Sequence, residues 1–235
     1  MSTVRILLAT FLAPERALPA AERASPWPPL LVATALSLLL AAALAPRIDY
    51  AAGALAELDK DPQATALLSP HDRTAKLEQA AKVGAFLAYA KALALPALRA
   101  GGVALALALG FWLAGTPAAL LGAFRVASYG LLPLALRDLL SLPAALRAKD
   151  LPPGAAGGLF PSALARLLSP AAPPPLVHLA EGLDLFALWA VVLLALGMAE
   201  VAGASRRRAL GVLLALWVFY LLGARVALPG LWRAA

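Results

Sequence analysis

The chain has 235 residues, of which 62% are hydrophobic and 14% charged, and its mean hydropathy is +0.82. Soluble domains are about half apolar and about a quarter charged, so the composition excludes an ordinary soluble protein and predicts an integral membrane protein. The chain has no cysteine, which excludes disulfides, thiolate catalysis and cysteine-ligated metal sites. The net charge of +7 then indicates basic segments that face anionic lipid headgroups, with no nucleic-acid partner.

The N-terminal segment, residues 1–28, contains an apolar stretch at residues 6–13 that is too short to span a bilayer. A signal peptide would need a longer apolar core that leads to a small-residue cleavage site. We therefore predict an amphipathic helix that lies in the headgroup layer on the cytoplasmic face. Arg5, Arg16 and Arg23 are expected to contact lipid phosphates from this helix.

The remaining residues, 29–235, contain five apolar segments, and we predict that each crosses the membrane once. The fold class expected is all-α, an integral membrane bundle of five transmembrane helices preceded by the in-plane helix. The spans are predicted at residues 29–45, 95–114, 124–146, 183–202 and 209–227. The more polar or proline-rich segments 46–82 and 143–182 are expected to be outer loops, the first with one or two short helices.

Local signals add detail near the second and third spans. The step Ser69 to Asp72 reads as a helix cap. A single helix over residues 77–113 would be too long for one span, so its front half is expected to project beyond the bilayer or to bend at Pro96. The step Gly115-Thr116-Pro117 predicts a tight turn, with Thr116 as the N-cap of the third span.

Three consecutive arginines, Arg206, Arg207 and Arg208, separate the last two predicted spans. Arginine and lysine in short loops are retained in the cytoplasm, so this turn predicts a cytoplasmic N-terminus and an outer C-terminus, with the three arginines at lipid headgroups. Heavy use of Ala, Leu, Pro and Arg is typical of GC-rich bacterial genomes. We expect a multi-pass protein of the bacterial inner membrane.

Charged residues inside the predicted spans are costly to bury, which makes them candidate sites. Arg99 and Asp138 fall at matching depth in neighbouring spans, and they either form an ion pair or extend separately to the outer interface. Arg125 and Glu200 fall at matching depth near the cytoplasmic face, either as a structural pair or as a proton- or cation-linked site. Asp184 opens the fourth span, where it either caps the helix or contacts a ligand.

Catalytic signatures are missing from the sequence. Its two histidines, His71 and His178, lie in predicted loops far apart in the chain. No zinc-protease, nucleophile-elbow or phosphate-loop motif is present in a span. We therefore predict no enzyme activity, no metal site and no cofactor.

Two long segments carry a resemblance to a known family. The stretches GTPAALLGAFRVASYGLLPLAL and LDLFALWAVVLLALGMAEVAGASRRRA resemble bacterial members of the Yip family, the Ypt/Rab-interacting membrane proteins. The most specific positions are Asp184, Phe186, Trp189 and Gly197, whereas the Asp-Leu-x-Gly-Pro motif of eukaryotic members is absent. The resemblance implies a five-helix, non-enzymatic membrane protein, linked in eukaryotes to vesicle traffic and in bacteria sometimes to transporters. Because the eukaryotic motif is missing, Rab binding is not carried over.

Three functions remain. The resemblance and the lack of catalytic motifs favour a scaffold or partner of other membrane proteins, associated with a transporter or acting in membrane organisation. The charges inside spans suggest the first alternative, a small-solute or ion transporter. The N-terminal helix and the three-arginine turn suggest the second, a lipid-binding or membrane-remodelling protein.

Overall fold

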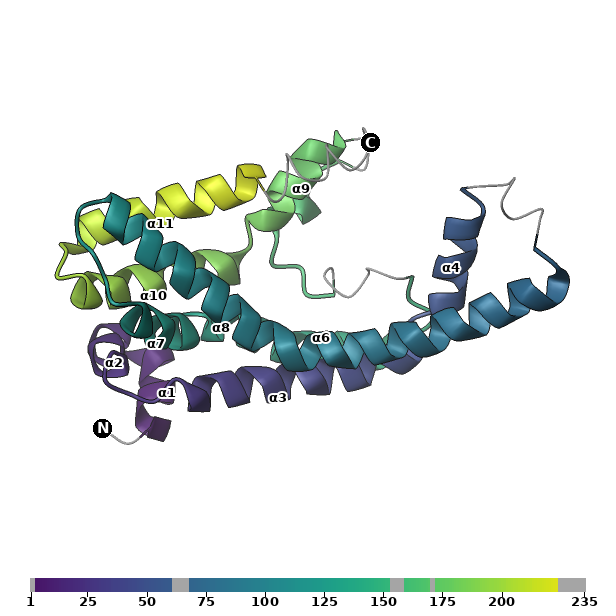
Figure 1. Ribbon diagram of the computed structural model, residues 1–235, viewed down its shortest axis with the longest axis horizontal. Helices are drawn as coiled ribbons and strands as arrows, with labels where there is room; N and C mark the ends of the chain where they lie inside the picture. The colour runs from purple at the N-terminus through teal and green to yellow at the C-terminus, as the bar shows by residue number, and fades with distance from the viewer. Residues whose placement is uncertain (1–2, 61–67, 153–158, 170–171, 224–235) are drawn as a thin grey trace. The chain divides into compact units, whose positions relative to one another are not determined.

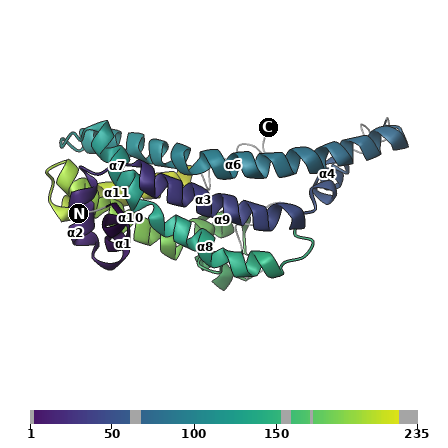
Figure 2. The ribbon, with the colours of Figure 1, turned by 90° about the horizontal axis from the view of Figure 1, so that it is seen from below.

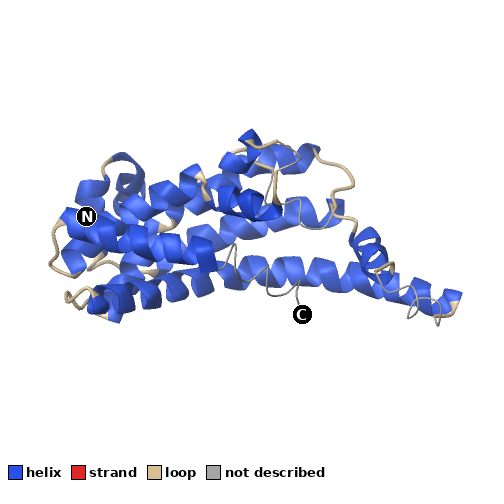
Figure 3. Cartoon of the chain, turned by 90° about the horizontal axis from the view of Figure 1, so that it is seen from above, coloured by secondary structure: helices blue, strands red, loops and turns tan. Residues whose placement is uncertain are grey.

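The computed structural model of the chain describes residues 3–60, 68–152, 159–169 and 172–223. Within these ranges every regular element is a helix, and β-structure is limited to isolated bridges (Figure 3). The helices, labelled in Figure 1, are α1 (Thr3–Leu12), α2 (Pro14–Ala21), α3 (Trp27–Leu44), η1 (Ala45–Arg47), α4 (Tyr50–Leu58), α6 (Pro70–Leu113), α7 (Leu120–Gly130), α8 (Leu132–Arg147), η3 (Leu164–Leu167), α9 (Pro174–Gly182), α10 (Leu185–Val201) and α11 (Arg206–Tyr220). The all-α prediction is confirmed.

Three helical stretches within the described residues are long and apolar enough to cross a membrane: Trp27–Arg47, Pro70–Leu113 and Leu120–Arg147. Helix α10 is also apolar but has 17 residues, and α11 has 15. The last residues of the predicted fifth span, 224–227, lie outside the described residues. The long apolar helices support a membrane location. That the chain has five membrane spans stays a prediction.

Helix α6 has 44 residues, about twice the ~20 needed to span a bilayer. It continues through Pro96 as one helix, which Figure 2 shows without a break. Its first residues, 70–82, belong to the segment predicted as an outer loop. The predicted cap at its start is confirmed, because the Ser69 hydroxyl oxygen accepts a hydrogen bond from the Asp72 amide at 3.1 Å.

Helix α6 ends at a glycine in the left-handed region, Gly115, with φ of +73°. The amide of Thr116 then donates to the carbonyl of Phe111 at 2.9 Å, which is the closing bond of a Schellman cap. Thr116 therefore ends α6, and the prediction that it caps the following helix is wrong. Helix α7 begins at Leu120 instead, with no side-chain cap from Ala119.

The predicted third span consists of two helices, α7 and α8, which meet at Leu131. Proline at position 133, in the first turn of α8, has no amide to donate into the preceding turn. This accounts for a new helix start at a point where the apolar sequence runs on without interruption.

The chain divides into two compact units. Unit 1 comprises Met1–Ala33, Pro96–Arg137 and Pro161–Ala235, and unit 2 comprises Thr34–Leu95 and Asp138–Phe160. In unit 1, α10 packs against α11, α7 and α2, and Figure 1 shows α10 and α11 side by side. Its buried side chains join those of α6, α7 and α11 in one apolar core, which includes Phe111, Val126 and Met198. Helix α10 is therefore the central element of unit 1.

The N-terminal residues form two helices, α1 and α2, which pack against each other as an N-terminal hairpin with Pro14 at the first position of α2. The sequence predicted one amphipathic helix here, and the proline makes it two. Ile6 and Leu18 of the hairpin share a second apolar core with Tyr129 and Leu193 of α7 and α10. One face of the hairpin is therefore fixed to unit 1.

Unit 2 has a smaller apolar core, formed by Ala43 and Leu44 of α3 and Ala145 of α8. Tyr50, at the start of α4, lies against Gly84 of α6, where any larger residue would meet the tyrosine ring. Burial of this hydroxyl raises the pKa of Tyr50 above its ordinary value, and Tyr89 adds to the shift.

Candidate functional site: polar contacts around helix α10

Helices α7 and α10 approach each other through glycines. A Cβ atom added to Gly197 would lie 2.5 Å from Cγ1 of Val126, and one added to Gly122 would lie 2.8 Å from Cγ1 of Val201. A Cβ atom added to Gly130 would likewise lie 2.6 Å from Cδ2 of Leu194. Each glycine thus receives a branched side chain of the facing helix, at intervals of about one turn. Small residues allow membrane helices to pack closely, so this contact fixes α7 relative to α10.

Two side chains of α7, one turn apart, hold the linker between α2 and α3. The Arg125 guanidinium donates to the Glu22 carbonyl at 2.9 Å, and the Tyr129 hydroxyl donates to the Ser25 carbonyl at 3.1 Å. Arg125 is half-buried, and its Nε is buried with no hydrogen-bond partner among the described residues. Both contacts tie the N-terminal hairpin to the helix that packs on α10.

We expect Tyr129→Phe to loosen this linker while leaving the apolar ring in place. Loss of one hydrogen bond lowers stability by about 1 kcal/mol, and hydrogen exchange should rise at residues 22–26 relative to the parent protein. Ser128→Ala is the control, because the Ser128 hydroxyl donates within its own helix to the Phe124 carbonyl at 2.8 Å. Equal exchange in both variants would contradict a linker anchored by Tyr129.

Asp184 is a buried carboxylate, 5% exposed, at the N-terminus of α10. Its Oδ1 accepts from the amides of Phe186 at 2.8 Å and Ala187 at 3.2 Å, so the predicted capping role is confirmed. Its Oδ2 accepts from the Ser162 hydroxyl and lies 3.8 Å from a guanidinium nitrogen of Arg137. One carboxylate therefore links α10 to the preceding loop and to α8.

The three arginines occupy the first turn of α11, where Ser205 accepts from the Arg208 amide at 3.3 Å. The preceding turn ends α10 at Gly203, with φ of +57°. Positive charge is unfavourable at a helix N-terminus, and two of the arginines have anionic or carbonyl partners elsewhere. Arg206 pairs with Glu15 of α2 at 3.3 Å, and Arg208 donates to the carbonyl of Ala114, at the end of α6.

These contacts place the α6–α7 turn, the α10–α11 turn and the start of α2 at the same end of unit 1. Arg208 joins the first two turns, because the Ala114 carbonyl belongs to the last turn of α6 and has no partner further along the helix. Arg207 is exposed and makes no hydrogen bond or ion pair with any described residue. The three arginines thus have different surroundings, although the sequence grouped them as headgroup contacts.

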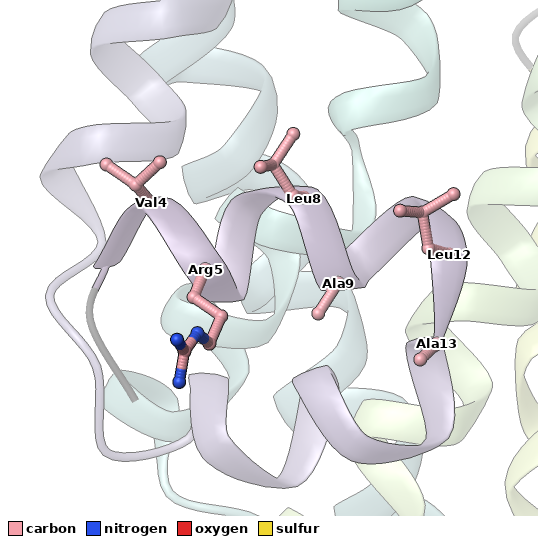
Figure 4. A pocket seen from close by; sticks show the side chains of 6 residues that line it. All are labelled: Val4, Arg5, Leu8, Ala9, Leu12 and Ala13. Atoms are coloured by element: carbon pink, nitrogen blue, oxygen red, sulfur yellow. The ribbon is translucent and has the colours of Figure 1, made fainter.

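One face of α1 carries large apolar side chains that are mostly exposed. Val4, Leu8 and Leu12 are 65%, 60% and 84% exposed and point to one side of the helix (Figure 4). Arg5 and the two alanines that follow it at four-residue spacing lie along the adjoining face (Figure 4). The two rows line an open groove of about 430 Å³.

The sequence of residues 8–227 matches the family model of the Yip1 domain. The chain belongs to the Yip family. It matches no curated protein sequence and no solved structure. Yip-family proteins are generally non-enzymatic membrane proteins, and the long apolar helices agree with a membrane protein of this family.

The Yip-family positions singled out in the sequence lie on α10 or, for Asp184, at its N-cap, and they face different neighbours. Asp184 holds the helix start, and Gly197 receives Val126 of α7. Trp189 lies edge-on to Phe11 of α1, with ring centroids 5.6 Å apart, and stacks beside Phe186 at 6.5 Å. In this Yip-family protein the motif therefore packs α10 against the N-terminal hairpin, α7 and the loop before α10.

The charges predicted to pair inside the spans of this Yip-family protein have the following surroundings. Asp138 accepts a hydrogen bond from the Ser37 hydroxyl of α3 at 3.1 Å, and its pairing with Arg99 stays a prediction. Glu200 is exposed. The described partner of Arg125 is the Glu22 carbonyl, which differs from the Glu200 carboxylate expected from the sequence.

The remaining titratable groups do not gather into a metal site within the described residues, where no group of three or more His, Asp or Glu side chains is placed to hold an ion. His178 lies 3.5 Å from Glu181 on α9, a local pair one turn apart. His71 lies exposed in the first turn of α6.

Sequence reasoning missed Ser162, Glu15 and Tyr129 as partners of the predicted residues. Each contact joins segments far apart in the chain: Ser162 and Asp184 are 22 positions apart, and Tyr129 and Ser25 are 104. Arg137 also lies beside Asp184. A single sequence contains no periodic signal for such contacts.

Proposed function

We propose that this Yip-family chain is a non-enzymatic scaffold or partner of other membrane proteins. The buried polar groups around α10 support this role. Thr10 and Ser128 donate to carbonyls of their own helices, and Asp184 caps α10 and joins neighbouring segments. These groups hold helices in place. The outward surface of the long helices is apolar, as with Leu98 and Leu105 of α6, which are 69% and 62% exposed.

The proposed topology has five spans in a bacterial inner membrane, with a cytoplasmic N-terminus and an outer C-terminus. Placement of both helix turns and the start of α2 at one end of unit 1 supports it, because a five-span chain puts its second-to-third and fourth-to-fifth connections on the same side. The exposed Arg207 at that end favours the cytoplasmic side.

Single cysteines test this topology cleanly, because the chain has none of its own. We expect an impermeant maleimide added to intact cells to label Asp59→Cys and Lys149→Cys, which lie in the predicted outer loops. Arg207→Cys should be labelled only after the membrane is permeabilised. Labelling of Arg207→Cys in intact cells would overturn the proposed orientation.

The scaffold role is tested by purifying the tagged chain in gentle detergent at its native level and quantifying co-purified proteins by mass spectrometry. An unrelated five-span protein with the same tag and expression level is the control. We expect at least one membrane protein near equimolar ratio with this chain and absent from the control. A chain that is purified alone, or only with proteins shared by the control, would contradict the proposal.

A further inference from the structure

The groove on α1 is mainly apolar along its length and has a positive charge at its N-terminal end. One wall is the row of large side chains Val4, Leu8 and Leu12, and the other is the row Arg5, Ala9 and Ala13. Residues four apart lie one above another on a helix, so both rows run along the helix axis (Figure 4). The small alanines leave space beside the large row, and the guanidinium stands at the N-terminal end of the groove.

The opposite face of α1 is fixed, so the groove cannot be closed by turning the helix. Ile6 is 5% exposed and belongs to the core shared with α7 and α10, and Thr10 is fully buried. Phe11 lies edge-on to Trp189 of α10. The exposed row is therefore held outward by the packing of the other face, and burying it against an apolar ligand would be favourable.

The charge at the end of the groove favours an anionic occupant. Arg5 is exposed and makes no hydrogen bond or ion pair with any described residue. The chain has a net charge of +7, which makes a second copy a less complementary partner than an anionic lipid. A phospholipid matches both parts, because its acyl chain is apolar and its phosphate accepts hydrogen bonds from a guanidinium.

We propose that the α1 groove binds one anionic phospholipid, with an acyl chain along Val4, Leu8 and Leu12 and the phosphate at Arg5. This site does not depend on the scaffold role, since it requires only that the chain lies in a bilayer. The lipid contact expected of the N-terminal segment is thereby assigned to one arginine, which lies beside an apolar groove.

The test places an environment-sensitive fluorophore on Leu8→Cys in the otherwise cysteine-free chain. The full chain is reconstituted in phosphatidylcholine vesicles that contain brominated lipid, either phosphatidylglycerol or phosphatidylcholine, at the same mole fraction. We expect quenching by brominated phosphatidylglycerol to exceed quenching by brominated phosphatidylcholine about fivefold, the preference that one arginine near an anionic headgroup provides. Adding Arg5→Gln should bring this ratio to about 1.

Lys76→Gln is the control, because it removes the same charge from an exposed position of α6 in unit 2. It should leave the quenching ratio unchanged. Equal quenching by both lipids in the Leu8→Cys protein would overturn the proposed preference for an anionic lipid at Arg5. No quenching by either lipid would overturn lipid binding in the groove, and protection that rises with the protein-to-lipid ratio would assign the groove to a second copy of the chain. An equal loss of preference in Lys76→Gln would also overturn the assignment to Arg5.

Discussion

Replacing Asp184 with alanine is expected to lower the apparent melting temperature of the purified protein by roughly 6–12 °C. The substitution removes the N-cap of α10 and leaves the Ser162 hydroxyl and the Arg137 guanidinium without this acceptor. Loss of a cap lowers stability by about 1 kcal/mol, and loss of hydrogen bonding to a charged group by about 1.5–3 kcal/mol. A total of about 3 kcal/mol corresponds to that shift for a chain of this size.

Two variants separate the functions of this carboxylate. Asp184→Asn keeps a side-chain oxygen for the amides of α10 but loses the charge beside Arg137, so its melting temperature should lie between those of the parent and Asp184→Ala. Asp59→Ala is the surface control, since it removes only an exposed ion pair with Arg73 at 3.8 Å. An Asp184→Ala protein as stable as Asp59→Ala would show that the buried contacts contribute nothing.

Replacing Gly197 with alanine is expected to destabilise the protein even though alanine favours helices. The added Cβ would lie 2.5 Å from Cγ1 of Val126 and 3.0 Å from its Cγ2. Valine is branched at Cβ and has little rotamer freedom in a helix, so α7 and α10 must separate. Overpacking of this kind lowers the free energy of unfolding by about 1–3 kcal/mol, measured as a lower melting temperature in detergent.

Gly211→Ala is the matched control, because a Cβ at Gly211 of α11 meets no atom of the described residues within 4 Å. That variant should be neutral or more stable by up to about 1 kcal/mol, the difference in helix propensity. Val126→Ala should restore most of the stability of Gly197→Ala, since it removes the two methyl groups in the clash. If Gly197→Ala and Gly211→Ala behaved alike, the close approach of α7 and α10 would be refuted.

Asp184 and Gly197 both position α10, so substitutions at either residue are expected to affect the proposed lipid site as well. Trp189 of α10 contacts Phe11 of α1, and Leu193 lies in the core below the N-terminal hairpin. A shift of α10 therefore removes support from the face of α1 opposite the groove. For this reason the lipid test uses Arg5→Gln, an exposed side chain, whose loss leaves that core intact.

The candidate site was predictable where its chemistry is local. Asp184 and Ser69 both precede a helical sequence, and a cap needs only amides two or three residues further along the chain. The partner of Arg125 was not predictable, because matching depth in two spans suggested Glu200 and ignored the linker between α2 and α3. The carbonyls of this linker are backbone groups, which every residue has, so no sequence pattern marks one of them as an acceptor.

The Thr116 cap fails for a related reason. A threonine before a proline is a usual helix start, but the glycine that precedes it adopts the left-handed conformation that ends α6. The helix-end signal, Gly115, and the helix-start signal, Thr116 before proline, are therefore adjacent in the sequence. The amide of Thr116 donates back to the Phe111 carbonyl, so the end of α6 determines the conformation here.

The sequence by itself determined that the chain is helical and apolar enough for a membrane, because composition and periodicity reflect the solvent that each residue must face. Its motifs resemble those of the Yip family, and the family model matched over residues 8–227 shows that the chain belongs to it. It also located the glycine of α10 and the capping carboxylate, whose roles follow from residue type. Only the tertiary structure decided that Arg206 pairs with Glu15, that Arg208 caps α6 and that Arg5 stands open at the end of a groove. These contacts join segments that are brought together by packing. An arginine has the same charge whichever partner it contacts, so residue type alone does not identify that partner.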